Sequence, residues 1–352
     1  MKNHSLLIWA SDLSENTGEG ILSRAFIAEI SKLNICKKVK IKTLEQEISV
    51  GNLDFKSIHL KEVSKTSLFH RYYGPIYGAI YLLLNSRRHT IIYLNYLPLW
   101  NFLVFFILPR KTILGPITGG IYKNSANNLN LIIRKYFFPI FYRISMFAIS
   151  KKFKKIIFST SILKPYVKKN SFYLFDFVIL LFDKYVSSLV KNKRSRKKYD
   201  IIFYNRNHAT KNTANMRKIL IFLSSYCKIC VVGDIFDQEK IKNFGWIKRD
   251  EVCKLIRQSK LAFNSAENFL SIFGIDCANN GTPVIYDKNL KPEEKFQNNN
   301  YIAINFDNIK KSCLQVLRLI SKNNTKLNSD FWKSIKIKKT NIRKFIYSYL
   351  LI

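Results

Sequence analysis

The chain begins with a short apolar run, a polar stretch and a segment of helical periodicity. Residues 5–9 have the length and composition of a buried parallel strand. The polar stretch after them contains Gly18 and Gly20. Apolar residues then recur at helical spacing, at Leu22, Phe26, Ile30 and Leu33. This pattern predicts a strand, a turn and a helix.

The same alternation continues through the first half of the chain. Strand-like runs lie at 39–43, 58–60, 91–94, 113–114 and 156–159, and apolar segments of helical length lie at 76–84 and 131–147. Alternating strands and helices indicate a parallel sheet with helices on both faces.

A second series of the same kind follows a basic run. Residues 191–198 carry six positive charges in eight positions and no large apolar side chain, which is typical of an exposed linker. The alternation resumes with segments at 201–204, 219–223, 229–233, 252–256, 261–264 and 284–285. We therefore expect an α/β fold of two doubly wound, Rossmann-like domains. The expected limits are 1–190 for the first domain, 191–199 for the linker, 200–330 for the second domain and 331–352 for a C-terminal helix.

The twenty residues 90–109 contain no charge and are long enough to span a membrane as a helix. Three interruptions (Asn95, Pro98 and Asn101) divide them into a strand-like piece at 91–94 and an apolar helical piece at 102–108. We favour a buried strand followed by a core or interfacial helix, with a spanning helix as the alternative.

The net charge is strongly positive, with 59 Lys and Arg residues against 23 Asp and Glu residues and a formal value of +36. The lysines are spread over most of the length, and Asn and Ile are also abundant, which indicates a compositional bias. Charge bears on partners rather than on fold. It favours an anionic partner, either nucleotide phosphates or an anionic membrane surface, or both.

Cysteine and histidine give little support for a metal site. The closest cysteine pair, Cys227 and Cys230, lies in an apolar run, so we interpret both as strand residues rather than as zinc or redox ligands. The five histidines have no metal-ligand spacing. The N-terminus leads directly into the first strand without a cleavable small-residue site, so we expect no signal peptide and a reducing cytoplasm.

Residues 245–285 carry the most informative pattern. A helix with Val252, Leu255 and Ile256 on one face leads to the strand 261–263, and a polar run then opens onto a second helix that ends at Gly281. Ligands of open α/β sheets bind beyond the carboxyl ends of strands, where helix N-terminal amides can bind a phosphate. Glu267 stands where a carboxylate could accept hydrogen bonds from a sugar hydroxyl. A solvated glutamate at a helix start is the alternative.

The loop after the first strand of the second half carries Arg206 and Lys211, five residues apart. Both could bind one diphosphate, the arginine as a fork and the lysine as a point charge. Taken alone, the pair could also be solvated loop charges. His208 lies between them, and we expect it to be exposed.

These segments together resemble the second domain of retaining glycosyltransferases of the two-domain GT-B fold, the group 1 (family 4) class. The shared order is Arg-x4-Lys, a Val-Val-Gly strand end, a Gly after a short strand, and a Glu ahead of a helix that ends in Gly-Thr-Pro-Val-Ile. The matching residues are Arg206, Lys211, Val231-Val232-Gly233, Gly245, Glu267 and Gly281-Thr282-Pro283-Val284-Ile285. The resemblance covers about residues 200–310, and the first half matches only in its opening glycine-containing turn and its alternation.

The sequence departs from the family in two places. The family's second acidic residue lies eight positions after the first and five before the Gly of Gly-Thr-Pro. Asp276 is five before Gly281, but Asn268, not Glu267, is eight before Asp276. Either the loop holds one extra residue or Asn268 takes the first acidic position. The family's first-domain histidine has no counterpart in the loop 115–120.

The resemblance implies a GT-B architecture with two domains facing a cleft and the last helix packing back on the first domain. It implies transfer of a sugar from a nucleotide-sugar donor to an acceptor hydroxyl, with retention at the anomeric carbon. Glu267 would be catalytic and would hold the donor sugar. The expected donor-binding residues are Arg206 and Lys211 at the diphosphate, Asp276 at the ribose, and Asn268, Gly18 and Gly20. No cofactor or metal is expected, because the two cations would neutralise the departing diphosphate.

We expect the acceptor to be a glycan or a lipid-linked glycan in surface polysaccharide synthesis. The apolar segment 102–108 and the basic aromatic segments 134–138 and 151–155 favour peripheral attachment to an anionic membrane surface, at its cytoplasmic inner face. Nucleic acid is not an expected partner. A basic nucleic-acid-binding protein and a non-catalytic membrane-surface protein are the alternatives.

Overall fold

A computed structural model describes residues 5–15, 17–32, 38–50, 68–94, 99, 101–118, 136–167, 172–183, 197–206, 214–264, 269–290, 301–322 and 329–351. These residues form two compact units. Unit 1 holds the described residues up to Leu180 and those from Lys339 onward, and unit 2 holds those from Leu181 to Lys338. The units divide ahead of the basic run 191–198.

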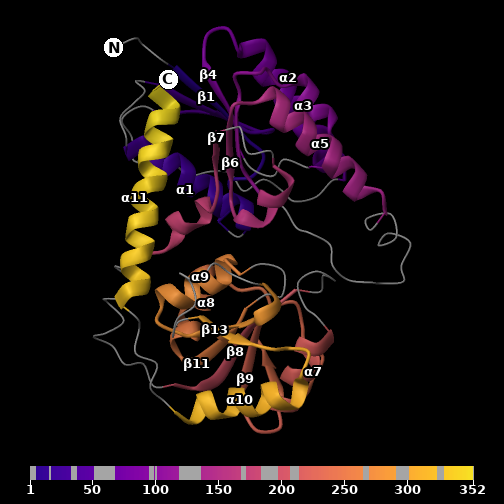
Figure 1. The fold of residues 1–352 in the computed structure, drawn as a ribbon, viewed down its shortest axis with the longest axis vertical. Coiled ribbons are helices and arrows are strands. Elements are labelled where there is room, and N and C mark those ends of the chain that lie inside the picture. Colours follow the sequence, from indigo (N-terminus) through magenta and orange to yellow (C-terminus); the bar gives the residue numbers. More distant parts are fainter. Residues whose placement is uncertain are drawn as a thin grey trace. The chain divides into compact units, whose positions relative to one another are not determined.

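Unit 1 is built on a seven-stranded sheet in the order β3-β2-β1-β4-β5-β6-β7 (Figure 1). The strands are β1 Ser5–Ala10, β2 Lys38–Lys42, β3 Glu47–Val50, β4 Thr90–Leu94, β5 Ile113–Ile117, β6 Lys155–Phe158 and β7 Phe172–Leu174. All neighbours pair in parallel except β2 and β3. The antiparallel edge differs from the wholly parallel sheet that the alternation predicts. Its cause is a tight turn in which the Thr43 N–H donates to the Gln46 carbonyl at 2.9 Å.

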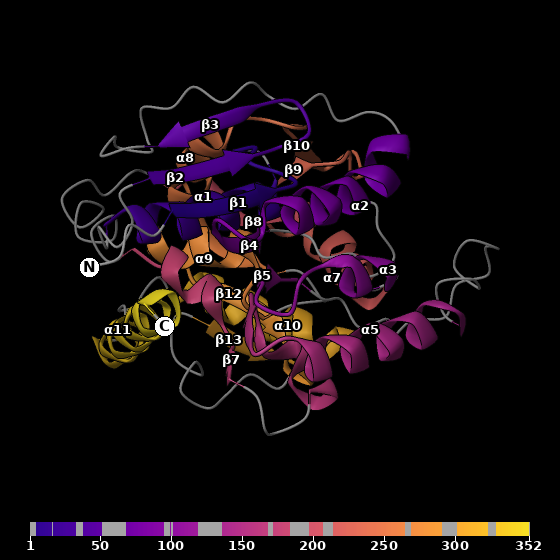
Figure 2. The same cartoon turned by 90° about the horizontal axis from the view of Figure 1, so that it is seen from above.

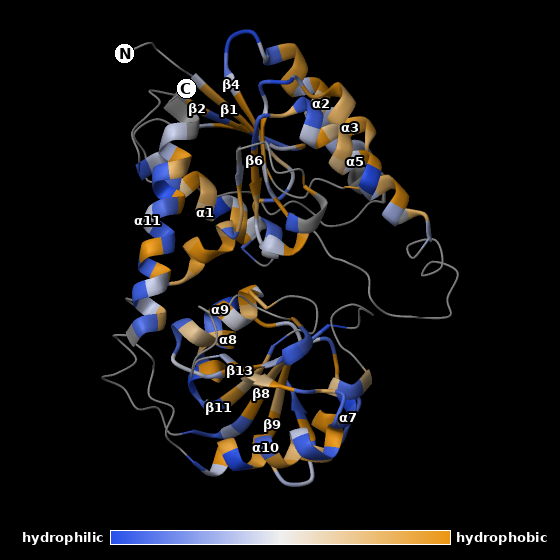
Figure 3. Cartoon of the chain, viewed as in Figure 1, coloured by the Kyte–Doolittle hydropathy of each residue, from blue (hydrophilic) through white to orange (hydrophobic). Residues whose placement is uncertain are grey.

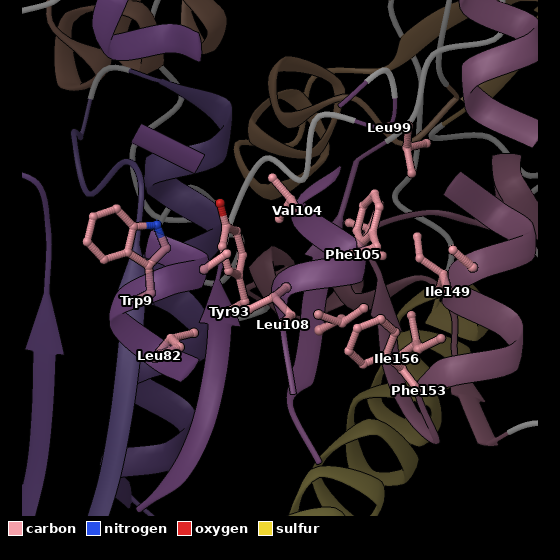
Figure 4. Close-up of a cluster of buried hydrophobic side chains, with 14 of the residues drawn as sticks. Trp9, Leu82, Tyr93, Leu99, Val104, Phe105, Leu108, Ile149, Phe153 and Ile156 are labelled. Atoms are coloured by element: carbon pink, nitrogen blue, oxygen red, sulfur yellow. The ribbon is translucent and has the colours of Figure 1, made fainter. Parts of the chain in front are cut away.

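Helices cover both faces of this sheet. They are α1 Gly18–Lys32, α2 Leu68–Asn85, α3 Leu103–Ile107, α5 Phe138–Lys152 and the 3-10 helices η2 Ser161–Tyr166 and η3 Phe177–Leu181. Figures 1 and 2 show α2, α3 and α5 on the face opposite to α1. Figure 4 shows the core beneath them, to which the central strands contribute Trp9 and Tyr93 and the helices contribute Phe105 and Ile149. On the other face, the Phe26 ring packs 5.4 Å from the Phe177 ring.

The uncharged segment 90–109 is not one helix. Its first residues form β4, a central strand of the sheet with four fully buried side chains, and the short helix α3 follows. The preferred interpretation, a strand and then a short helix, is therefore confirmed, and the spanning helix is wrong. No helix in the described part of the chain has the length and apolar content needed to cross a bilayer. The strand predicted at 58–60 lies outside the described residues.

Unit 2 has a six-stranded parallel sheet in the order β10-β9-β8-β11-β12-β13. The strands are β8 Tyr199–Asn205, β9 Ile229–Gly233, β10 Ile241–Asn243, β11 Ser259–Phe263, β12 Val284–Asp287 and β13 Tyr301–Ile304. Helices α7 Ala214–Leu223 and α10 Ile309–Ser321 cover one face, and α8 Arg249–Arg257 and α9 Ile272–Asn279 cover the other; η4 spans Lys288–Leu290. This strand order, 3-2-1-4-5-6 in chain sequence, is that of a Rossmann fold.

The C-terminal helix α11, Ser329–Leu351, contributes to both units. At its start, Phe331 and Trp332 pack edge-on against Phe182 within unit 2. Further along, Arg343 forms a two-pronged ion pair with Glu29 of α1 at 2.8 and 3.0 Å within unit 1. Burial opposes ionisation of Glu29, but its hydrogen bonds to Arg343 and Lys32 outweigh that effect and lower its pKa.

Candidate functional site

The strand order of unit 2 changes direction between β8 and β11. Ligands of open α/β sheets bind at such a switch point, beyond the carboxyl ends of the strands. Phe263, the last residue of β11, pairs with Phe203 of β8, and β8 continues for two more residues to Asn205. Arg206 directly follows β8, and the segment that begins at Asn264 directly follows β11. The structure therefore brings the two sequence motifs to neighbouring strand ends.

An aromatic group surrounds the end of β8. The Tyr204 ring stacks on Phe273 of α9 with centroids 5.8 Å apart, and it meets the Trp246 ring edge-on at 6.0 Å. Trp246 is 61% exposed and donates its indole N–H to Asp234 at 2.9 Å. Burial raises the pKa of the Tyr204 phenol; the Arg206 guanidinium opposes the rise and Asp234 adds to it. The exposed Arg206 and the exposed indole of Trp246 thus both lie near the half-buried Tyr204.

The Val-Val-Gly strand end has a backbone role. Gly233 has a φ of +97°, and a Cβ at this position would lie 2.3 Å from the Asn205 carbonyl oxygen. The Asn205 amide, fully buried, donates to the Asp234 and Ile235 carbonyls at 2.9 and 3.1 Å. Together these contacts hold the turn after β9 close to the end of β8. Only glycine permits so near an approach.

Buried polar contacts frame the segment after β11. The Asn264 amide donates to the Phe269 carbonyl at 2.8 Å, and its oxygen accepts from the Ser271 hydroxyl. Ser271 also caps α9, because its hydroxyl oxygen accepts from the Gly274 N–H at 3.0 Å. These hydrogen bonds hold the residues on either side of 265–268 in place. Glu267 and Asn268 belong to that segment and lie outside the described residues.

Asp276 lies on α9 and is only 6% exposed. Its carboxylate accepts two hydrogen bonds from Arg249 of α8, at 2.9 Å from Nε and 2.5 Å from the terminal nitrogen. Burial acts to lower the pKa of Arg249, but the hydrogen bond and the charge of Asp276 outweigh it and raise that pKa. Each carboxylate oxygen has two acceptor positions. Asp276 can therefore accept from a further hydroxyl while Arg249 holds its orientation.

The remaining predicted residues are spread over the chain. Lys211 and His208 lie outside the described residues. Gly18 and Gly20 lie in the first turn of α1 in unit 1, not in a loop. The Thr17 hydroxyl accepts from the Gly20 N–H at 3.1 Å, and a Cβ on Gly20 would lie 2.0 Å from the Ser14 carbonyl oxygen. This contact gives Gly20 a packing role, and donor binding by either glycine stays a prediction.

The described cysteines are thiols within or beside the sheet of unit 2. Cys230 is buried on β9, where burial raises its pKa to about 12, and Cys227 just before the strand has a pKa raised to about 11 by burial. In the part of the chain that the structure describes, no three His, Cys, Asp or Glu side chains are grouped so as to hold a metal ion.

Sequence reasoning did not find Arg249, Trp246, Asn264 or Ser271. Ser271 and Gly274 had a usable signal, because a serine three residues before a helical N–H is a common N-cap. Arg249 had none. Its partner Asp276 lies on another helix, and only the packing of α8 on α9 brings them together.

Comparisons with known proteins identify the fold. No family model matches the sequence, and no curated protein matches it. Among solved structures, a glycosyltransferase from Rickettsia africae ESF-5 is similar at 16% identity over 99% of this chain and 98% of that one, with a TM-score of 0.55. Anabaena Alr3699/HepE, solved with UDP and glucose, is similar at 12% identity over 98% of both chains, with a TM-score of 0.59.

A UDP-GlcNAc 2-epimerase from Methanocaldococcus jannaschii is also similar, at 11% identity over 97% of this chain and 99% of that one, with a TM-score of 0.51. The expected fold class, two Rossmann-like domains of GT-B type, is thereby confirmed. Since a transferase and an epimerase share this fold, the reaction must be argued from the site.

Proposed function

We propose that this protein is a retaining glycosyltransferase, which transfers a sugar from a nucleotide-sugar donor to a glycan or lipid-linked acceptor. The observation that carries the proposal is the position of Arg206 at the end of β8, beside the strand end from which the Glu267 segment leaves. A cation and a carboxylate on segments that follow these strands suit the diphosphate and the sugar of a nucleotide sugar. The diphosphate needs positive charge, and the sugar hydroxyls need an acceptor.

Each expected residue has a chemical role in this proposal. Arg206 and Lys211 neutralise the charge that develops on the departing diphosphate, which lowers the barrier without a metal or a cofactor. Glu267 holds the donor sugar as the catalytic carboxylate, and Asn268 lines the same loop. Asp276, oriented by Arg249, accepts from the ribose. Gly18 and Gly20 are the two further residues to which we assign donor binding.

Trp246 extends the donor site. Its exposed indole packs edge-on against Tyr204, two residues before Arg206, and aromatic faces stack on nucleobases. The base would therefore lie at Trp246 and the diphosphate at Arg206. The Anabaena protein was solved with UDP, which makes UDP-sugars the first donors to test.

We further propose that the acceptor belongs to surface polysaccharide synthesis and that the protein works in the cytoplasm at the inner face of the membrane. The free thiols of unit 2 suit a reducing compartment. An anionic membrane surface is the proposed macromolecular partner, and nucleic acid is not.

A ligand screen followed by product analysis tests the function. Thermal unfolding is measured with UDP, GDP and ADP sugars, because a ligand of the native state raises the midpoint. The stabilising donor is then incubated with candidate lipid-linked acceptors, and NMR reads the anomeric configuration of the product. Retention supports the proposal. Inversion would exclude the retaining class, and a changed free sugar nucleotide without transfer would identify an epimerase.

The two binding-protein alternatives predict other results. A nucleic-acid-binding protein would bind RNA or DNA with a steep loss of affinity as salt rises, and no sugar nucleotide would stabilise it. A non-catalytic membrane-surface protein would bind vesicles and transfer no sugar from any donor.

A further inference from the structure

Helix α5 of unit 1 exposes large apolar side chains along one side. Ile140 is 54% exposed and Phe147 is 55% exposed, and Phe137 and Ile144 are exposed between and beside them. These positions recur at intervals of three and four, so they form one stripe along the helix. The side that packs on the sheet is also apolar, with Met146 and Ile149 buried in the core. Helix α5 is therefore apolar on both sides, whereas a surface helix of a globular protein usually carries polar residues on its outer side.

The neighbouring helix α3 continues this apolar surface. Leu103 is exposed and Phe106 is 59% exposed, and the Phe102 ring stacks on Phe141 of α5 at 5.9 Å. Figure 3 shows hydrophobic residues along α2, α3 and α5, which lie side by side on this face of unit 1. Contiguous exposed apolar surface of this kind marks an interaction site. We call Leu103, Phe106, Ile140, Ile144 and Phe147 the α3–α5 surface.

A crevice between α3 and α5 has apolar walls and a cationic rim. Its volume is about 240 Å³, and Phe106, Phe147, Arg110, Lys151 and Lys152 line it together with Ala148. Lys152 holds the two helices together, because its Nζ donates to the Phe105 and Phe106 carbonyls at 3.0 and 2.6 Å. The Lys151 Nζ lies 4.6 Å from the centre of the Phe147 ring. Positive charge thus surrounds exposed hydrocarbon.

The charge of this part of the chain selects the occupant. Between Glu62 and Asp176 the sequence contains 17 Lys and Arg residues and no Asp or Glu. A second copy docking by the same face would bring like charges together, which is unfavourable. A nucleic acid would meet the cations but would leave the exposed isoleucine and leucine side chains without an apolar partner. An anionic bilayer offers both phosphate groups and hydrocarbon.

We propose that the α3–α5 surface docks unit 1 in the plane of an anionic lipid bilayer. Phe106, Ile140 and Phe147 enter the boundary between headgroups and acyl chains, as in interfacial helices. Arg110, Lys151 and Lys154 bind lipid phosphates at the same depth. The crevice receives part of one anionic lipid. This surface lies within unit 1 and needs no sugar nucleotide, so it stands or fails separately from the proposed transferase activity.

Flotation with lipid vesicles tests the proposal. The probes are vesicles of phosphatidylcholine alone and of equal parts phosphatidylcholine and phosphatidylglycerol. We expect the protein to float only with the anionic vesicles and to be released by high salt. Each basic residue near an anionic surface contributes about 1 kcal/mol, so the triple variant Arg110→Gln, Lys151→Gln, Lys154→Gln should lose on the order of 100-fold in affinity. The apolar triple variant Phe106→Ser, Ile140→Ser, Phe147→Ser should lose at least about 10-fold.

Unit 2 offers matched controls. Ile221→Ser, Phe222→Ser, Tyr226→Ser removes three exposed apolar side chains at α7, and Lys218→Gln, Lys240→Gln, Lys310→Gln removes three exposed charges. Both should bind vesicles like the parent chain. Thermal midpoints of all variants show that they remain folded.

Three results would overturn the proposal. The first is that the two unit 1 variants bind anionic vesicles as well as their unit 2 controls do. Another is a parent chain that ignores anionic vesicles but binds RNA or DNA. The third is a parent dimer that the apolar unit 1 variant dissociates while vesicle binding persists.

Discussion

The ion pair between Arg249 and Asp276 provides the sharpest test of the site in unit 2. Replacing Arg249 by Met removes the cation but keeps much of the apolar volume of its side chain. The Asp276 carboxylate, almost fully buried, then loses two charged donors. We expect unit 2 to lose stability, because a buried charge without its partner retains its desolvation cost.

The size of the loss follows from burial and from the number of bonds. Breaking a fully buried pair costs about 3–5 kcal/mol. The Arg249 side chain is 39% exposed, so water can reach the vacated position and solvate part of the carboxylate. Solvent screening of this kind reduces the expected loss to about 2–3 kcal/mol. With a urea dependence of roughly 2–3 kcal/mol per molar, the transition should move by about 1 M.

Urea-dependent hydrogen exchange is a suitable assay, because peptides from α8, β11 and α9 report on unit 2 separately from unit 1. Lys254→Met is the matched control, since it removes an exposed cation from the same helix. The double variant with Asp276→Asn should recover part of the loss, which gives the coupling energy. An Arg249→Met loss no larger than that of Lys254→Met would refute the reasoning. If Arg249 also orients Asp276 at the ribose, the variant raises the donor KM.

Arg206→Ala and Lys211→Ala should each lower kcat by roughly 10- to 150-fold with the correct donor, because a charge-assisted contact contributes about 1.5–3 kcal/mol, whereas Lys240→Ala should not. Glu267→Gln should impair transfer with the fold intact, and Asn268→Ala should impair it much less. The reverse ranking would show that Asn268, not Glu267, takes the family's first acidic position. Gly233→Ala should destabilise unit 2 by at least about 2 kcal/mol in urea denaturation, because φ is positive and the new Cβ would lie 2.3 Å from the Asn205 carbonyl oxygen. Gly245→Ala, with φ +68° and open space around it, should cost about 1 kcal/mol. Because the folded pKa of Glu29 is lowered from 4.5, its pair with Arg343 stabilises unit 1 above that pH and loses this contribution as pH falls through the lower folded value. Arg343→Gln should therefore cost about 1 kcal/mol at neutral pH and progressively less in acid, and Lys333→Gln, in an exposed pair, should show no such trend.

The sequence alone determined most of the elements and the fold class. Buried parallel strands such as β8 and β9 are continuous apolar runs, and helices such as α8 show a one-sided apolar pattern, so the chain displays them locally. The order of the motifs around Arg206 and Gly281 pointed to the same fold. The elements missed include β3, β7, β13 and α10. Three of them are short edge strands, and little local pattern accompanies a strand with one neighbour.

Only the tertiary structure decided which strand ends are neighbours and which surfaces stay open. Arg206 and Asn264 are far apart in the chain, and the pairing of β8 with β11 places them at one edge. The partnership of Arg249 with Asp276 and the outward side of α5 are likewise results of packing. Local periodicity records that an element has an apolar face. The partner of that face depends on contacts between distant segments, which no stretch of sequence contains by itself.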